Sequence, residues 1–233
     1  MSSIRFPFLS TLLPALLPIS LLGLPLMASA APLTLADLRP GDLLVTEYLA
    51  DPVGVNDAQG EYFEILNLRD QAVDLEGLTV RDDGSNQFSV SGVSIAAGGF
   101  AVFASNDGSD LGFSPDFVYG ARMSLTNTDD EIVLVGAGGT TLHTLRYTDG
   151  DAFGDGIAHE LRVAMRGLTD SSGPALGDDF VAAGNALALG NFGSPGFAGN
   201  TRIDVSAVPV PPALWLFGSG LVAAFTRLRF RRR

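Results

Sequence analysis

The sequence predicts an all-β sandwich or barrel over its middle part, residues 31–208, and three observations lead to that fold class. Short apolar or alternating runs recur about every 10–15 residues, a spacing typical of strands in sandwiches and barrels. Turn-forming pairs such as Asp83-Gly84 and Gly138-Gly139 separate the runs. No long stretch of this part shows the 3.6-residue apolar period of a helix.

The apolar runs define the expected strands. In the run Tyr62–Asn67, Phe63 and Ile65 share one face and are predicted to point into the core. Residues 176–190 have the weakest pattern, and a helical turn is the alternative there. The segments predicted as strands are Leu43–Leu49, Tyr62–Asn67, Leu78–Arg81, Phe88–Val90, Phe100–Ala104, Glu131–Val135 and Thr141–Tyr147.

Charge divides the 233-residue chain into three parts. All 26 acidic residues lie between Asp37 and Asp204, whereas only eight of the 14 arginines do, so this part has a formal net charge of −18. Such a surface repels phosphate backbones, and no phosphate-binding glycine loop is present, so we expect no nucleic-acid partner. The absence of cysteine excludes a disulfide framework, a thiolate zinc site and a cysteine nucleophile.

Residues 1–30 have the pattern of a secretory signal peptide. Arg5 gives a positive start, a leucine-rich stretch follows, and no further charge occurs before Asp37. Small residues at the end of the stretch predict cleavage by signal peptidase after Ala30, a site made by Ala28, Ala30 and Ala31. An uncleaved anchor helix is the alternative, but three prolines would each remove a backbone donor and kink it: Pro14, Pro18 and Pro25.

The C-terminal part, residues 208–233, combines a proline motif, an apolar stretch and a basic end. The motif comprises Val208, Pro209, Val210, Pro211 and Pro212. The uncharged stretch Ala213–Phe225 predicts a short transmembrane helix of about 20 Å, and only the longer run from Val208 to Thr226 approaches the roughly 30 Å of a bilayer core. The arginines keep their end cytoplasmic, so the domain faces outward; they are Arg227, Arg229, Arg231, Arg232 and Arg233.

This order of segments resembles the PEP-CTERM sorting signal of Gram-negative bacteria, with Val210 in the place of the glutamate that gives the signal its name. The resemblance implies an exosortase as a partner, which would act near Pro209–Pro211 after a transient stay in the inner membrane. The domain would then reach the cell surface or the extracellular space, either released or covalently attached. A permanent single-span anchor and a buried apolar helix remain the alternatives.

An ordered series of short motifs in the middle part resembles the lamin-tail domain, which is an immunoglobulin-like β-sandwich. The series consists of Gly41–Glu47, Gly60–Asn67, Ala72–Val80, Ile95–Phe100 and Leu125–Leu134. The family's closing Gly-Thr-Pro-Gly and Asn segment is matched by Gly193–Gly196 and Asn200, with Phe180 in the place of the preceding aromatic residue. The expected organisation is a linker 31–40, a sandwich 41–201 with core 41–150 and closing extension 151–201, a linker 202–207 and the tail 208–233.

Catalytic chemistry is not expected. The chain has two histidines and no Gly-x-Ser-x-Gly elbow. We expect His143 to face solvent on a strand and His159 to lie in a polar loop. Glu64 and Asn67 are expected to be structural, holding turns and strand ends by hydrogen bonds.

Calcium is the one cofactor that the sequence suggests, and no other is expected. Asp149, Asp151 and Asp155 lie in a glycine-containing loop, and carboxylates on such loops are typical calcium ligands. The loop is not an EF-hand, because Phe153 occupies a position that needs an oxygen ligand. A solvated acidic turn is the alternative.

The sequence therefore predicts a non-catalytic, exported surface or matrix protein whose partners include exopolysaccharide or other surface proteins. A carbohydrate- or calcium-binding adhesion module is one alternative. Another is a permanently membrane-anchored accessory domain to a secreted hydrolase. A carbohydrate module needs an exposed aromatic platform, to which four tyrosines could contribute: Tyr48, Tyr62, Tyr119 and Tyr147.

Overall fold

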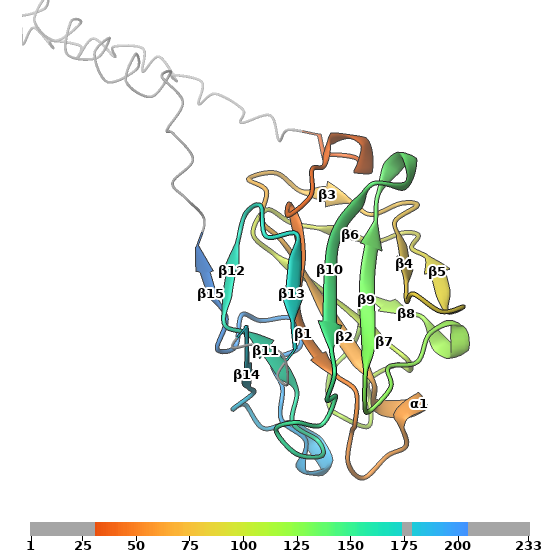
Figure 1. The fold of residues 1–233 in the computed structure, drawn as a ribbon, viewed down its shortest axis with the longest axis vertical. Helices are drawn as coiled ribbons and strands as arrows, with labels where there is room; N and C mark the ends of the chain where they lie inside the picture. The colour runs from red at the N-terminus through yellow and green to blue at the C-terminus, as the bar shows by residue number, and fades with distance from the viewer. Residues whose placement is uncertain (1–30, 174–178, 205–233) are drawn as a thin grey trace, which may run out of the picture. The chain divides into compact units, whose positions relative to one another are not determined.

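The computed structural model describes residues 31–173 and 179–204, which form two β-sheets packed against each other (Figure 1). The expected signal peptide, the proline motif and the arginine cluster lie outside the described residues. Within the described ranges, no helix is long and apolar enough to cross a membrane. The all-β class predicted from the sequence is confirmed.

The larger sheet has six strands in the order β14-β11-β1-β2-β7-β8. Its neighbours pair antiparallel except for β7 and β8, which are parallel. Its strands are β1 (Leu43–Leu49), β2 (Tyr62–Asn67), β7 (Phe100–Ala104), β8 (Phe117–Val118), β11 (His159–Leu161) and β14 (Phe180–Ala182).

The second sheet has five strands in the order β13-β10-β9-β4-β5, and two short pairs complete the structure. Its strands are β4 (Thr79–Arg81), β5 (Gln87–Ser89), β9 (Asp130–Val135), β10 (Thr141–Tyr147) and β13 (Asp170–Ser172). The short pairs join β3 (Val73–Asp74) to β6 (Ser94–Ile95), and β12 (Val163–Met165) to β15 (Arg202–Asp204). The helical turns are η1 (Leu35–Asp37), α1 (Asp57–Gly60), η2 (Gly120–Arg122), η3 (Ala137–Gly139) and η4 (Ala188–Gly190).

The longer strands have the bounds that the sequence predicts. β1, β2, β7 and β10 agree at both ends, and β4, β5 and β9 differ by one residue at one end or both. The remaining strands were not predicted, because two or three residues are too few to show an alternating pattern. Residues 176–190, where the sequence pattern is weakest, contain the short strand β14 and also a helical turn, η4.

Side chains from both sheets fill one large apolar core. Phe63 and Ile65 point into it as predicted, and each is fully buried. Tyr48 of the larger sheet stacks on Tyr147 of the second sheet at 4.6 Å and so joins the layers, whereas Phe63 stacks on Phe103 of the neighbouring strand at 5.2 Å. Burial of each such side chain contributes about 1.5–3 kcal/mol to folding.

The closing extension covers the outer face of the larger sheet. Every residue of β2 is buried, including Tyr62 and Glu64, which the alternation places opposite Phe63. Tyr62 belongs to a second apolar cluster, against which Phe113 and Leu187 pack. The outer face therefore carries buried polar groups that an exposed sheet face would not hold.

Both expected linkers include ordered segments that pack on the sandwich. Leu35 and Leu38 enter the core from residues 31–40, and Leu33 bridges to Val73. On the other side, Arg202–Asp204 form β15, which pairs parallel with β12. The ordered domain thus extends beyond residues 41–201 at both ends, because short strand pairings that leave no sequence pattern hold these segments.

Candidate functional site

Three glutamates lie side by side on the outer face of the larger sheet. Glu160 of β11 pairs in register with Glu47 of β1, and Glu47 pairs with Glu64 of β2. Each residue is at most 1% exposed. None of the ion pairs formed within residues 31–173 and 179–204 includes any of them. We call Glu47, Glu64 and Glu160 the carboxylate row; like charges placed directly opposite one another are destabilising unless protons or donors compensate them.

The donors come from residues 193–200, which we call the clasp. The backbone N–H of Ser194 donates to Glu47 Oε1 at 2.7 Å, that of Gly196 to Glu64 Oε2 at 2.7 Å and that of Asn200 to Glu160 Oε2 at 2.6 Å. Glycine occupies the two positions where the clasp comes closest to the sheet. A Cβ on Gly193 would overlap the Tyr62 hydroxyl, and a Cβ on Gly199 would overlap Glu160. Each carboxylate of the row thus receives one backbone donor from the clasp.

Proton counting shows that the row cannot be fully ionised in this geometry. The Ser194 hydroxyl lies 2.8 Å from Glu47 Oε2 and 2.8 Å from Glu160 Oε1. A hydroxyl has one hydrogen, so it donates to one carboxylate and must accept a proton from the other. Burial, opposed by the hydrogen bonds from Tyr62 and Ser194, raises the pKa of Glu47 to about 7. Burial and the neighbouring Glu47 raise the pKa of Glu64 well above its ordinary value.

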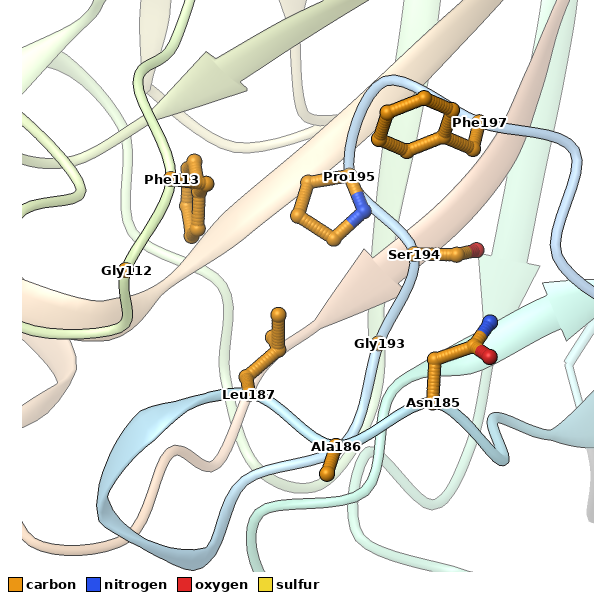
Figure 2. Close-up of a pocket in the computed structure, with 9 residues that line it drawn as sticks. All are labelled: Gly112, Phe113, Asn185, Ala186, Leu187, Gly193, Ser194, Pro195 and Phe197. Atoms are coloured by element: carbon orange, nitrogen blue, oxygen red, sulfur yellow. The ribbon is translucent and has the colours of Figure 1, made fainter.

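A pocket of about 360 Å³ lies beside the clasp, and we call it the clasp pocket (Figure 2). Phe113, Leu187 and Pro195 give it apolar walls, and Phe197 is 73% exposed at its rim. Asn185 supplies a side-chain amide at the edge. Tyr62 links the pocket to the carboxylate row, because its ring packs edge-on against Phe113 at 5.1 Å and its hydroxyl donates to Glu47 at 2.5 Å.

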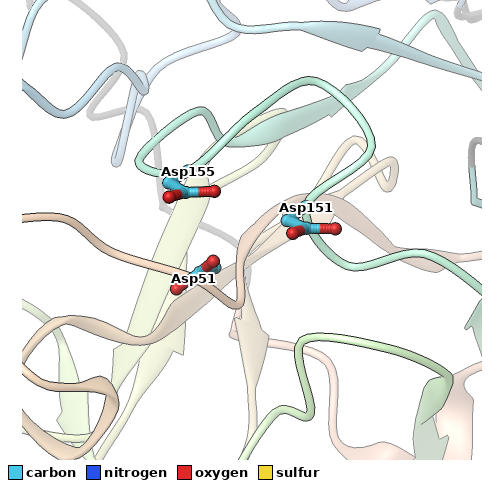
Figure 3. A group of neighbouring side chains, drawn as sticks. All are labelled: Asp51, Asp151 and Asp155. Atoms are coloured by element: carbon cyan, nitrogen blue, oxygen red, sulfur yellow. The ribbon is translucent and has the colours of Figure 1, made fainter.

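The structure brings two of the three calcium candidates together. Carboxylate oxygens of Asp151, Asp155 and Asp51 all lie within 4.8 Å of one another (Figure 3). Asp149 is not in this group; its hydrogen bond with Asp151 is the main cause that raises the pKa of Asp151. Burial and repulsion from the neighbouring aspartates raise the pKa of Asp51. Three converging carboxylates can supply oxygen ligands to a divalent cation, although calcium usually takes six to eight.

Both histidines lie where the sequence analysis did not place them. His143 is fully buried, and its Nδ1 donates to the Leu168 carbonyl while its Nε2 accepts from the Ser171 hydroxyl. His159 lies in β11, fully buried, and stacks on Tyr48 at 4.6 Å. The expectations of a solvent-facing residue and a polar loop were wrong, because β13 and the residues just before it cover His143 and the pairing of β11 with β1 buries His159.

The four tyrosines do not form the exposed aromatic platform that the carbohydrate-binding alternative would need. Each of the four tyrosines is at most 1% exposed, because each contributes to one of the two apolar clusters: Tyr48, Tyr62, Tyr119 and Tyr147. The exposed aromatic side chains are phenylalanines of the closing extension, Phe192 and Phe197.

Glu64 and Asn67 have hydrogen-bonding roles of the kind predicted. The Asn67 amide donates to the carbonyls of Gln71, Ile95 and Ala96, which ties the end of β2 to two loops. Glu64 accepts from the Thr46 hydroxyl at 2.7 Å and from the clasp. Sequence reasoning did not find that Glu64 is one member of a row, because its partner Glu160 lies on a strand that was not predicted.

The comparison with protein families agrees with this architecture. Residues 38–149 match the model of the Lamin Tail Domain family, close to the range of about 38–150 over which the resemblance was found. The match contains β1 to β10, and it ends before β11 and the clasp. No curated protein matches the chain. The carboxylate row is therefore completed by residues beyond the matched segment.

Proposed function

We propose that this lamin-tail-like sandwich is displayed at the cell surface or in the extracellular matrix by an exported, non-catalytic protein whose C-terminal tail an exosortase removes. The observation that carries the proposal is the order of proline motif, apolar stretch and terminal arginines in residues 208–233. The last described strand, β15, ends at Asp204, so only three residues separate the sandwich from Val208. A processing enzyme would thus cut outside the packed domain and leave it intact.

The state of the histidines supports a non-catalytic role. Burial lowers the pKa of His143 to about 4 and that of His159 to about 4, so both rings are neutral at physiological pH. Neither ring reaches solvent, so neither can take a proton from a nucleophile that faces a substrate. A surface module that binds or adheres needs no such group.

Processing predicts a defined change in mass. The protein from its native host should end between Val208 and Pro212 by intact mass spectrometry, and the arginine tail should be retained in cells that lack the exosortase. Replacing Pro209 and Pro211 together by alanine should also retain the tail, because alanine lets a helix extend into a segment that proline keeps extended. Pro115→Ala, in a loop of the sandwich, is the matched control and should be processed normally. A wild-type protein that keeps its arginines in both strains would contradict the proposal.

Binding of a neutral saccharide at the clasp pocket is a second candidate function, favoured by the exposed ring of Phe197 and the amide of Asn185, which line the same pocket. Sugars stack their apolar faces on aromatic rings and hydrogen-bond to amides, while the acidic domain would repel anionic sugars. Phe197→Ala should abolish retardation of the protein in gels that contain neutral polysaccharide. Phe192→Ala, outside the pocket lining, should not. Equal migration of wild type and Phe197→Ala in all gels would count against this candidate.

A further inference from the structure

A second pocket, of about 420 Å³, lies beside α1 and the start of β2, and we call it the Glu61 pocket. Glu61 and the hydroxyls of Ser105 and Ser124 give it polar lining. Its apolar lining consists of short or flexible side chains, namely Ala58, Ala121 and Met123. The volume lies in the range of sites for small molecules.

The carboxylate of Glu61 is buried in the wall of this pocket without a cationic partner. The residue is 1% exposed, and its carboxylate accepts from the backbone N–H of Leu125 at 3.0 Å and from the Ser124 hydroxyl at 3.1 Å. None of the ion pairs among the described residues includes it. Burial, with smaller contributions from the charges of Asp57 and Asp130 and opposed by the hydrogen bonds from Leu125 and Ser124, raises its pKa to about 7. An ionised carboxylate in such a place needs a positive charge to be stable.

The arginine at the end of η2, Arg122, does not supply this charge. Arg122 Nε donates to the Tyr119 carbonyl at 2.6 Å, and one of its terminal nitrogens donates to the Val118 carbonyl at 2.7 Å. Its guanidinium lies over the rings of Phe88 and Phe117, 5.7 Å and 5.3 Å from their centroids. These contacts hold the guanidinium over the two rings, and none of its ion pairs or hydrogen bonds among the described residues reaches Glu61.

A buried hydroxyl lies behind the wall of this pocket, close to Ser105 and Glu61. Tyr119 is fully buried, and among the described residues its hydroxyl has no hydrogen-bond partner. Burial raises the pKa of Tyr119 far above its ordinary value, and Ser105, which lines the pocket, lies close enough to lower it slightly. A buried polar group without a partner costs about 1–3 kcal/mol, so native proteins rarely keep one without a function.

We propose that the Glu61 pocket binds a small aliphatic primary ammonium ion, with Glu61 as its counter-ion. An ammonium group has three N–H donors, which match the Glu61 carboxylate and the hydroxyl oxygens of Ser105 and Ser124 in the pocket lining. Ala58, Ala121 and Met123 line the space for the alkyl chain. A divalent metal ion fits less well, because the only three carboxylates that converge among the described residues are those of Figure 3.

The chain offers its own reporter for this binding. Met123 lines the pocket, whereas Met165 lies on β12 and does not line it. We would record methyl NMR spectra of the full-length protein in a non-ionic detergent, with ¹³C-labelled methionine methyl groups, while n-butylammonium is added at pH 8. The Met123 signal should shift saturably and the Met165 signal should stay in place. Tetramethylammonium, which has no N–H donor, and n-butanol, which has no charge, should leave Met123 unchanged.

Two variants and a control test the role of Glu61. Glu61→Gln should weaken n-butylammonium binding at least about tenfold, because it removes the charge and keeps the shape. Glu76→Gln makes the same change at an exposed site outside the pocket and should bind like the wild type. Ala121→Leu leaves the carboxylate in place and should block binding by filling the pocket. For each variant, an unchanged Met165 signal reports that the fold is intact.

The same titration distinguishes a free amine from a lysine side chain of a partner. Nα-acetyl-lysine amide carries the same ammonium group on a longer chain with a bulky end. Saturable binding of n-butylammonium alone identifies a free amine as the ligand, and equal or tighter binding of the lysine derivative identifies a protein side chain. The proposal is overturned if neither shifts Met123, if n-butanol shifts it equally, or if Glu61→Gln binds as the wild type does.

Discussion

Glu47→Gln should make the protein at least as stable as the wild type at pH 7 and should flatten the pH dependence of its unfolding. Glutamine satisfies the proton count of the carboxylate row. Its carbonyl can accept from Tyr62 and from the Ser194 N–H, as Glu47 Oε1 does. Its amide N–H₂, in the place of Oε2, can donate to the Ser194 hydroxyl, which is then free to donate to Glu160.

Whether stability rises or falls with pH follows from the direction in which folding shifts the pKa of Glu47. The pKa of Glu47 rises from 4.5 to about 7 on folding, so between these values the folded protein binds more protons than the unfolded chain. The contribution of Glu47 to stability is complete below pH 4.5 and is lost as the pH rises to 7 and above. One pKa unit corresponds to about 1.4 kcal/mol, so the loss from Glu47 amounts to about 3 kcal/mol. Glu64, whose pKa is also raised, extends the loss to higher pH.

Urea unfolding followed by circular dichroism from pH 4.5 to 8.5 would measure this loss. The wild type should lose stability above pH 6.5, where the two buried histidines, whose lowered pKa values act in the opposite direction at lower pH, no longer change protonation. Glu47→Gln should lose visibly less stability than the wild type as the pH rises. Glu76→Gln, which neutralises an exposed carboxylate, should keep the slope of the wild type. Parallel curves for the wild type and Glu47→Gln would show that Glu47 is ionised in the folded protein, contrary to the proton count.

The sequence predicts the long strands well, because the apolar pattern that marks a long strand lies within the strand itself. β1, β2, β7 and β10 have five to seven residues each, enough for an apolar pattern to mark both ends. β11 has three residues, so its pattern could not be recognised, and His159 was placed in a loop. The pairing of Tyr48 with His159 buries this histidine, and a pairing between residues so far apart leaves no local signal.

The candidate site was predicted only in part, for the same reason. Glu64 was expected to be structural from its place in an alternating strand, and the clasp residues were matched to a closing motif. The row itself depends on three strands meeting in register, two of them close in sequence and one more than 90 residues away. Asp51 was missed in the acidic group of Figure 3 because it precedes Asp151 by 100 residues.

Ser194→Ala should loosen the clasp, which the three backbone donors still hold, and destabilise the protein by about 1–3 kcal/mol at pH 7. The substitution removes the only hydroxyl between Glu47 and Glu160 and leaves their facing oxygens without a donor. Cleavage by chymotrypsin after Phe197 would measure the loosening, because this side chain is already exposed and only the held backbone protects the bond. Ser91→Ala, on an exposed turn, is the matched control and should change neither stability nor cleavage.

The double variant Glu47→Gln/Ser194→Ala separates loss of a hydrogen bond from repulsion between carboxylates. In the wild type, removing the Ser194 hydroxyl brings two acids face to face. In the Glu47→Gln background, removing the hydroxyl brings the glutamine N–H₂ toward the Glu160 carboxylate, and this contact is favourable. Ser194→Ala should therefore cost about 1 kcal/mol less in the Glu47→Gln background, as a positive coupling in a double-mutant cycle. Additive costs would mean that Ser194 holds the clasp through its own hydrogen bonds alone and that the two carboxylates do not share a proton through it.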